Sequence, residues 1–158
     1  GGYGAAKIAH EQATLAGPIP ARVVRAAQFH EFVEELIGWG RQGEVSHVPE
    51  MRTQLVAAST VAEAVADLAT GPDSEFASGA AGVMPEIAGP REEALVEVAR
   101  LLVDRRGETL RIEGATDRSD PDHEVYTSGA LLPGPDATLA GPTFAEWLEA
   151  NVLARSSR

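Results

Sequence analysis

Residues 21–37, ARVVRAAQFHEFVEELI, decide the fold expected for this chain. Val23 and Val24 lie at the centre of the first seven residues, a pattern typical of a short, buried parallel strand over residues 21–27. The strand leads directly through Gln28, Phe29 and His30 into a second segment with apolar residues at helical spacing, namely Phe32, Val33, Leu36 and Ile37. We therefore expect a strand followed at once by a helix.

The rest of the chain repeats this alternation. Apolar spacing and helix-ending glycines predict further helices over residues 5–15, 61–69, 91–106 and from residue 143 onward. Short apolar or alternating runs predict strands over residues 54–57, 85–90 (an edge strand) and 109–112. Residues 72–83 and 114–142 are rich in turn-forming residues and are predicted to be mostly loop. The alternation indicates an α/β fold with a mainly parallel sheet.

Three helix starts carry sequence signals. Thr60 with Glu63, and Thr143 with Glu146, have the spacing of a capping box, in which each side chain satisfies the other residue's backbone N–H. Pro90 is expected to open the helix over residues 91–106, because the first helical position tolerates a missing N–H. The last helix is expected to bury Phe144, Trp147 and Leu148.

Composition narrows the class of protein. The 158 residues carry a net charge of −11, and their 13 Lys and Arg residues are scattered, so we expect no nucleic-acid binding. The absence of cysteine excludes disulfides and thiolate chemistry and fits a reducing cytoplasm. No apolar run approaches the roughly 18 residues that a membrane span needs. We therefore expect a cytoplasmic protein that does not bind membranes.

The first residues carry a pair with chemical meaning. Tyr3 and Lys7 are four residues apart, so on a helix they share one face, with about 5–6 Å between their Cβ atoms. An adjacent ammonium favours the phenolate form of a tyrosine, which suits a general acid/base. Dehydrogenases use this pair to hold a nicotinamide ribose and to move a proton. The simpler alternative is an aromatic residue at a helix start and a solvated lysine.

The position of this pair suggests that the chain is part of a longer one. A glycine-rich turn that binds a dinucleotide lies before the first helix of its domain, and no such turn precedes Tyr3. The two or three strands available for the sheet are also too few for an independent doubly wound sheet. We therefore interpret the chain as the back portion of a nucleotide-binding protein, with its glycine-rich half and the missing strands upstream.

Six segments, taken in order, resemble a known family. They are YGAAKIAHEQ (3–12), VVRAAQFHEF (23–32), QLVA (54–57) leading into VAEA (61–64), EIAGP (86–90), GALLPG (129–134) and PTFAEWL (142–148). This ordered set is similar to the C-terminal half of the atypical short-chain dehydrogenase/reductases, the NmrA-like NAD(P)-binding proteins. The similarity covers nearly all of the chain.

The resemblance implies the C-terminal portion of a Rossmann-like domain, with a small substrate-side region formed by the later helices and loops. It implies that Tyr3 is the catalytic proton donor and that Lys7 orients the ribose and tunes Tyr3, so that both residues are catalytic and cofactor-binding. It also implies further cofactor contacts from Ala27, Gln28 and Phe29. His30 would contact the substrate. The cofactor would be NAD or NADP, with NADP slightly favoured, and it would bind only together with the missing N-terminal half.

Three functions remain open at this point. The first is hydride transfer from NAD(P)H to a small carbonyl or quinone-like acceptor. The second is a non-catalytic NAD(P)-binding redox sensor that acts through a protein partner. The third is a stand-alone α/β interaction domain that binds no nucleotide. Without upstream strands, the strand over residues 21–27 would present an open edge, which favours self-association.

Two alternatives at the predicted site concern Phe29 and His30. Phe29 could instead pack in the core, and His30 could cap the following helix rather than contact a ligand. His30 and Glu34 share a helical face, but two ligands do not make a metal site. The acidic run from Asp117 to Glu124 lacks the spacing of a calcium loop. We therefore predict no metal site.

Overall fold

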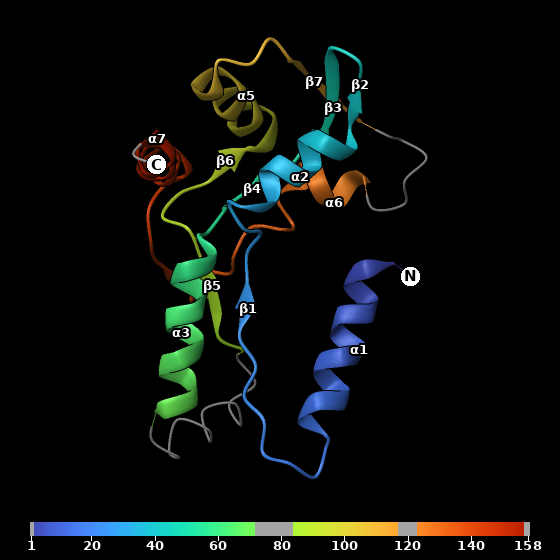
Figure 1. Ribbon diagram of the computed structural model, residues 1–158. Coiled ribbons are helices and arrows are strands. Elements are labelled where there is room, and N and C mark those ends of the chain that lie inside the picture. Colours follow the sequence, from blue (N-terminus) through green and yellow to red (C-terminus); the bar gives the residue numbers. More distant parts are fainter. Residues whose placement is uncertain (1, 72–83, 117–122, 157–158) are drawn as a thin grey trace.

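The computed structural model describes residues 2–71, 84–116 and 123–156. At its lower end in Figure 1, three short strands form a parallel sheet in the order β1-β5-β8. They are β1 (Arg25–Ala26), β5 (Glu86–Ala88) and β8 (Thr138–Leu139). Arg25 is in register with Glu86, and Ile87 with Thr138. Helices α1 (Tyr3–Leu15) and α3 (Ala58–Thr70) lie on either side of this sheet (Figure 1).

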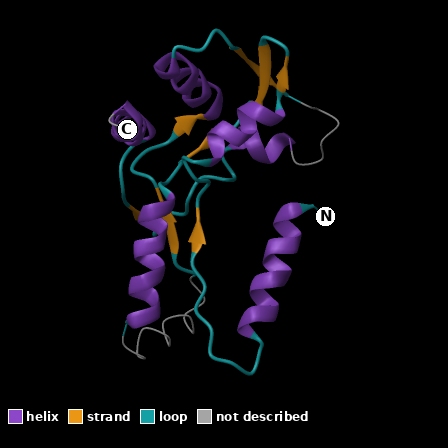
Figure 2. Ribbon diagram, viewed as in Figure 1, coloured by secondary structure: helices purple, strands orange, loops and turns teal. Residues whose placement is uncertain are grey.

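The upper end of the molecule contains a second small sheet and most of the helices (Figure 2). Its strand order is β2-β3-β7, with β2 (Arg41–Gln42) antiparallel to β3 (Val45–Pro49), and β3 parallel to β7 (Arg111–Ala115). A separate two-strand ladder pairs β4 (Arg52–Thr53) with β6 (Glu93–Ala94) in antiparallel fashion. The helices of this region are α2 (Phe32–Trp39), α5 (Leu95–Arg106), α6 (His123–Ser128) and α7 (Phe144–Ser156).

Two apolar clusters correspond to these two ends. The larger cluster joins α2, β3, α5, β7 and α7, and its residues include Val33, Val48, Leu95, Ile112 and Phe144. The smaller cluster joins the parallel sheet to α3 through Val56, Val61 and Ile87. The segments between Gln28 and Ala57 pass from one cluster to the other, so they connect the parallel sheet to the upper region.

The α/β class and the parallel sheet expected from the sequence are confirmed. The first strand is shorter than predicted, because only Arg25 and Ala26 of residues 21–27 pair with β5. Both residues are exposed, so the expectation of a buried strand is wrong. The physical reason is position: within the described residues, β1 lies at one edge of the three-stranded sheet and pairs only with β5.

The segment over residues 85–90 differs from its prediction in two ways. Strand β5 lies between β1 and β8, so it is the central strand of the sheet and not an edge strand. Pro90 does not open a helix, because the chain first forms β6 against β4, and α5 begins only at Leu95. The apolar period predicted for this helix is confirmed, since Leu95, Val98 and Leu102 are buried.

The connecting regions also hold more regular structure than predicted. Within residues 54–57, Val56 forms only an isolated bridge to Phe29, whereas β3 and β4 lie just before it. The strand predicted over residues 109–112 appears as β7, a few residues later. Residues 114–142, predicted to be mostly loop, contain α6 and β8. The loop predicted over residues 72–83 and Asp117, Asp120 and Asp122 of the acidic run lie outside the described residues.

The two predicted capping boxes have opposite outcomes. At α7, the Glu146 carboxylate accepts from the backbone N–H and the hydroxyl of Thr143, at 2.8 and 2.7 Å, and the Glu146 N–H donates back to the Thr143 hydroxyl. At α3, the helix begins at Ala58, two residues before Thr60, and no side-chain cap is formed by its N-cap residue. The Glu31 carboxylate accepts from the Ala58 N–H instead, at 3.2 Å.

None of the helices in the described part of the chain is both long enough and apolar enough to cross a membrane.

Candidate functional site

Helix α1 and strand β1 are joined by a bidentate ion pair. The Arg25 guanidinium donates to both oxygens of Glu11, at 2.9 and 2.8 Å, and this hydrogen bonding holds the pKa of the Glu11 carboxyl below its usual value. The helix and the strand run in opposite directions (Figure 1). Tyr3 therefore lies about 12 Å before Glu11 along the helix axis, and Phe29 lies about 13 Å beyond Arg25 along the extended chain. The Tyr3 end of α1 and the carboxyl end of β1 thus lie at the same level.

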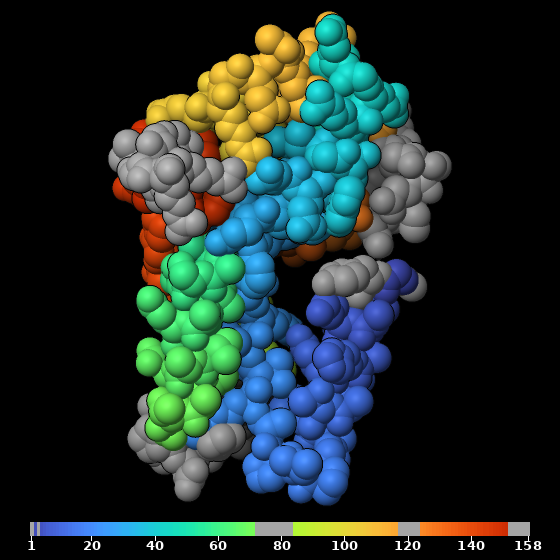
Figure 3. All heavy atoms as spheres, viewed as in Figure 1, coloured from blue at the N-terminus to red at the C-terminus, as the bar shows by residue number. Residues whose placement is uncertain are grey.

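Helix α1 carries Tyr3 and Lys7 one turn apart, as the sequence predicts. Lys7 is exposed, and so are Ile8 and Leu15 on the same helix. Figure 3 shows open space between the upper half of α1 and the rest of the molecule. Lys7 and Ile8 are therefore not packed into a core.

Ala27, Gln28 and Phe29 continue β1 at the carboxyl end of the sheet. The Ala27 N–H donates to the Ile87 carbonyl at 2.9 Å, which extends the ladder by one residue. The Gln28 carboxamide is turned into the protein, because its oxygen accepts from the Thr53 hydroxyl at 2.8 Å and its nitrogen lies 4.0 Å from the Met51 sulfur. Phe29 remains 38% exposed. Of the three residues, Phe29 presents the largest apolar surface.

His30 is held differently from its neighbours, since only 1% of its surface is exposed. Its Nε2–H donates to the Pro142 carbonyl at 3.0 Å, which leaves Nδ1 as a buried lone pair without a partner among the described residues. The ring packs against Phe144 and Trp147, each with a centroid distance of 5.4 Å. Burial lowers the pKa of His30, because the charged imidazolium loses its hydration. The ring thus connects the start of α2 to α7.

Hydrogen bonds between Gln54 and Gly89 form a polar network at the carboxyl end of the parallel sheet. The Gln54 side chain is buried and donates to the Gly89 carbonyl at 2.8 Å. The Gly89 N–H donates back to the Gln54 carbonyl at 3.3 Å. Gly89 is needed here because a Cβ at this position would lie 1.8 Å from the Leu55 carbonyl oxygen. The network fixes the segment before α3 against the residues that follow β5.

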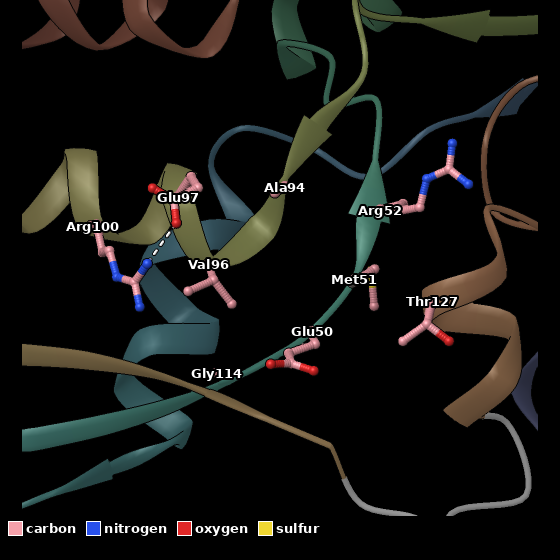
Figure 4. A pocket seen from close by; sticks show the side chains of 9 residues that line it. All are labelled: Glu50, Met51, Arg52, Ala94, Val96, Glu97, Arg100, Gly114 and Thr127. Carbon is pink, nitrogen blue, oxygen red and sulfur yellow. Dashed lines mark hydrogen bonds and ion pairs between the residues drawn. The ribbon is translucent and has the colours of Figure 1, made fainter.

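A pocket of about 350 Å³ lies beside β4 and the start of α5. Single residues of β6, β7 and α6 contribute to its lining (Figure 4). The remaining lining comes from two groups of three residues: Glu50, Met51 and Arg52 at the start of β4, and Val96, Glu97 and Arg100 of α5. A volume of this size lies at the low end of the range for small-molecule sites. One lining residue, Met51, lies near the carboxyl end of β1, because its sulfur is 4.0 Å from the Gln28 carboxamide nitrogen.

The sequence reasoning missed this pocket. Its lining comes from five elements that are spread over residues 50–127, and no local pattern connects them. The register of the β4–β6 ladder brings Arg52 opposite Ala94, and the Leu95 N–H donates to the Met51 carbonyl at 3.0 Å. Only the tertiary structure joins these segments.

The comparisons with known proteins support the fold. No protein-family model matches the sequence, and a search of the curated proteins gave no match. Among solved structures, the chain is similar to TunA, described as an NAD-dependent NDP-hexosamine 5,6-dehydratase involved in tunicamycin biosynthesis. The TM-score is 0.53 and the identity is 13%, over 96% of this chain and 51% of TunA. The chain therefore spans about half the length of that protein, and at this identity the likeness establishes a Rossmann-like α/β fold.

Proposed function

We propose that the chain is the C-terminal part of an NAD(P)-dependent oxidoreductase-like protein of the atypical short-chain dehydrogenase/reductase class. Its reaction would be hydride transfer to a small carbonyl or quinone-like acceptor. The observation that carries the proposal is the antiparallel pairing of α1 with β1 through Glu11 and Arg25, which brings Tyr3 and Lys7 level with the carboxyl end of a parallel strand. Ligands of open α/β sheets bind at that end.

The exposed residues here suit the nicotinamide-ribose half of a dinucleotide. The Lys7 ammonium is exposed and provides hydrogen-bond donors for ribose hydroxyls. Phe29 offers a partly exposed apolar ring to a nicotinamide. Gln28 would contribute through its position beside Phe29, since its carboxamide is engaged with Thr53. The donor set therefore fits the cofactor that the resemblance implies.

In the proposed reaction the chain's own residues position the acceptor and supply a proton. A bound nicotinamide would supply the hydride. Tyr3 would donate its phenolic proton to the acceptor oxygen as negative charge develops there, and Lys7 would stabilise the resulting phenolate. The acceptor would lie in the pocket lined by Met51, whose sulfur is 4.0 Å from the Gln28 carboxamide nitrogen.

The open edge of β1 supports the expectation of an upstream half. Within the described residues, β1 pairs on one side only, and its two residues are exposed. A free strand edge leaves backbone donors and acceptors available for another strand. TunA is about twice as long as the aligned region, so a further segment that adds strands at this edge is consistent with the comparison.

A non-catalytic redox sensor is the second candidate, and His30 favours it. This ring was predicted to contact substrate, but it is buried and bound to the Pro142 carbonyl. If His30 serves only to connect α2 to α7, the predicted substrate contact is lost, and only the cofactor-side residues, Tyr3 and Lys7 among them, keep their predicted roles. A protein with those two residues could bind the cofactor and report its redox state through a partner without turnover.

The test uses the chain together with its in-frame upstream coding sequence. NADH and NADPH binding would be measured by fluorescence titration, and turnover with a panel of small carbonyls and quinones. We expect binding by the extended protein, and none by residues 1–158 alone. Tyr3→Phe should abolish turnover and leave cofactor binding unchanged, whereas Tyr126→Phe, at the other tyrosine of the chain, should preserve both.

Each other result has a distinct meaning. Cofactor binding without turnover, unchanged in Tyr3→Phe, would favour the sensor. An extended protein that binds neither dinucleotide would refute both candidates and leave the interaction domain. Cofactor binding by residues 1–158 alone would contradict the proposal that the pyrophosphate-binding half lies upstream.

A further inference from the structure

The pocket beside β4 has an apolar wall and four charged residues, of which only some are paired. Met51 and Val96 provide the apolar wall, and Glu50, Glu97, Arg52 and Arg100 provide the charges (Figure 4). A cavity with apolar walls and a few polar groups is the usual form of a small-molecule site. The identity of its ligand therefore depends on which of these charges is free to meet one.

Both arginines are already paired with carboxylates. Arg52 donates to both oxygens of Glu92, at 2.6 and 3.0 Å, and also to the Ser128 carbonyl. Figure 4 shows its guanidinium directed away from Glu50. Arg100 pairs with Glu97 at 2.5 Å and lies 3.4 Å from the Ile112 carbonyl. Neither guanidinium offers an uncompensated positive charge to an anionic ligand.

Glu50 is different, because no cation is paired with it among the described residues. Its hydrogen-bond partner there is the Thr116 hydroxyl, at 2.7 Å. Glu50 is exposed and its carboxylate lies next to Gly114 of β7, on the same lining as Met51 and Val96 (Figure 4). An unpaired carboxylate on the lining favours a ligand that donates hydrogen bonds and carries positive charge, since such a pair is stronger than a neutral one.

The volume limits the ligand further. A cavity of about 350 Å³ corresponds to about a dozen water molecules. A small organic amine fits this space, whereas a nucleoside diphosphate sugar is larger and would bring two or more negative charges towards Glu50. The pocket therefore differs in its preferred ligand from a site for the NDP-hexosamine named for TunA.

We propose that this pocket binds a small amine, with its ammonium on Glu50 and its apolar body against Met51 and Val96. The binding itself does not depend on a dinucleotide. If the amine also carries the carbonyl group that accepts the hydride, it would be the substrate of the oxidoreductase. That further step rests on the proposed function. The two ideas can fail separately, because amine binding is measured on residues 1–158 without cofactor.

The two methionines of the chain make the test specific. Met51 lines the pocket, whereas Met84 lies just before β5 and does not line it. With ¹³C-methyl methionine labelling, each methyl group gives one NMR signal, assigned through Met51→Leu. Benzylamine, benzyl alcohol and benzoate would be titrated as probes that share a ring and differ in charge.

We expect benzylamine to shift the Met51 signal saturably and to leave the Met84 signal in place. Benzyl alcohol and benzoate should bind at least tenfold more weakly. Glu50→Gln keeps an acceptor for the Thr116 hydroxyl and should weaken benzylamine binding about tenfold. Glu44 is exposed, as Glu50 is, but lies outside the lining, so Glu44→Gln makes the same charge change and should alter benzylamine binding less than twofold.

Three results would overturn the proposal. The first is a Met51 signal that benzylamine does not move at millimolar concentration. The second is binding of benzoate or benzyl alcohol as tight as that of benzylamine. The third is an equal loss in Glu50→Gln and Glu44→Gln, which would trace binding to the net negative charge of the chain rather than to the pocket.

Discussion

Replacing Gly89 by alanine should destabilise the protein more than its small size suggests. A Cβ at this position would lie 1.8 Å from the Leu55 carbonyl oxygen and 2.9 Å from the Leu55 carbonyl carbon. Real Cβ contacts are essentially never shorter than 3.0 Å. The obstacle is backbone, so no side-chain rotation can relieve it. The segment before α3 must therefore move away from the residues that follow β5.

The expected loss in free energy of unfolding can be estimated from the contacts that this movement disrupts. Overpacking of this kind costs about 1–3 kcal/mol. The same movement lengthens the two hydrogen bonds between Gln54 and Gly89, each with a net value of about 0.5–1.5 kcal/mol. We therefore expect Gly89→Ala to lower the free energy of unfolding by about 2–5 kcal/mol. That is a large part of the roughly 5–15 kcal/mol typical of a domain.

Urea unfolding followed by far-UV circular dichroism measures this loss as a lower midpoint at constant slope. The matched control is Gly38→Ala in α2, where a Cβ would meet nothing within 4 Å. Because glycine is unfavourable inside a helix, that variant should gain up to about 1 kcal/mol. An unchanged midpoint in Gly89→Ala, or an equal loss in both variants, would refute the close approach at Gly89.

Three further predictions concern α7 and its neighbours. Phe144→Ala should cost about 3–5 kcal/mol in urea unfolding, since the ring is fully buried against His30, and a loss below 1 kcal/mol would contradict its place in the core. Burial lowers the pKa of folded His30, so the unfolded chain binds the proton first as the pH falls below about 6.5. The free energy of unfolding should then drop by up to about 1.4 kcal/mol per pH unit. His30→Gln can still donate to the Pro142 carbonyl but should lose this pH-dependent component. The same pH dependence in the variant and the wild type would contradict the role of His30. Thr143→Ala should lower thermal stability by about 0.5–2 kcal/mol, whereas Thr60→Ala should change it little, and equal effects would argue against the observed caps.

The contrast between the two capping boxes shows where sequence reasoning reaches its limit. At Thr143 the donors and acceptors of the box lie within three residues of one another, so a local pattern contains everything that is needed. At Thr60 the same pattern competes with Glu31, which is distant in sequence and reaches the Ala58 N–H in the folded chain. The helix starts two residues earlier as a result, and no local signal indicates it.

The same reasoning explains what was predicted of the sheet and what was not. The parallel arrangement follows from strands separated by helices, so it could be predicted from the alternation. The position of each strand in the sheet could not, because β5 became central through pairing with β8, a strand of two residues within a segment predicted to be loop. Short strands of this kind are specified by their partners more than by their own residues.

The candidate site also has some features that depend on a single element and others that depend on tertiary pairing. The proposal of Tyr3 and Lys7 rests on spacing alone, and that of Phe29 on its position after a strand, since each depends on one element. The pocket depends on the β4–β6 ladder, in which only Arg52–Ala94 and Thr53–Glu93 are paired. That register places Met51 against the first turn of α5 and, through its sulfur, beside Gln28. A one-residue shift in the pairing of β4 with β6 would turn the side chains of the shifted strand to the opposite face. The apolar part of the pocket lining would then be lost. The contact between Met51 of the pocket and Gln28 therefore depends on tertiary register, which two residue pairs determine.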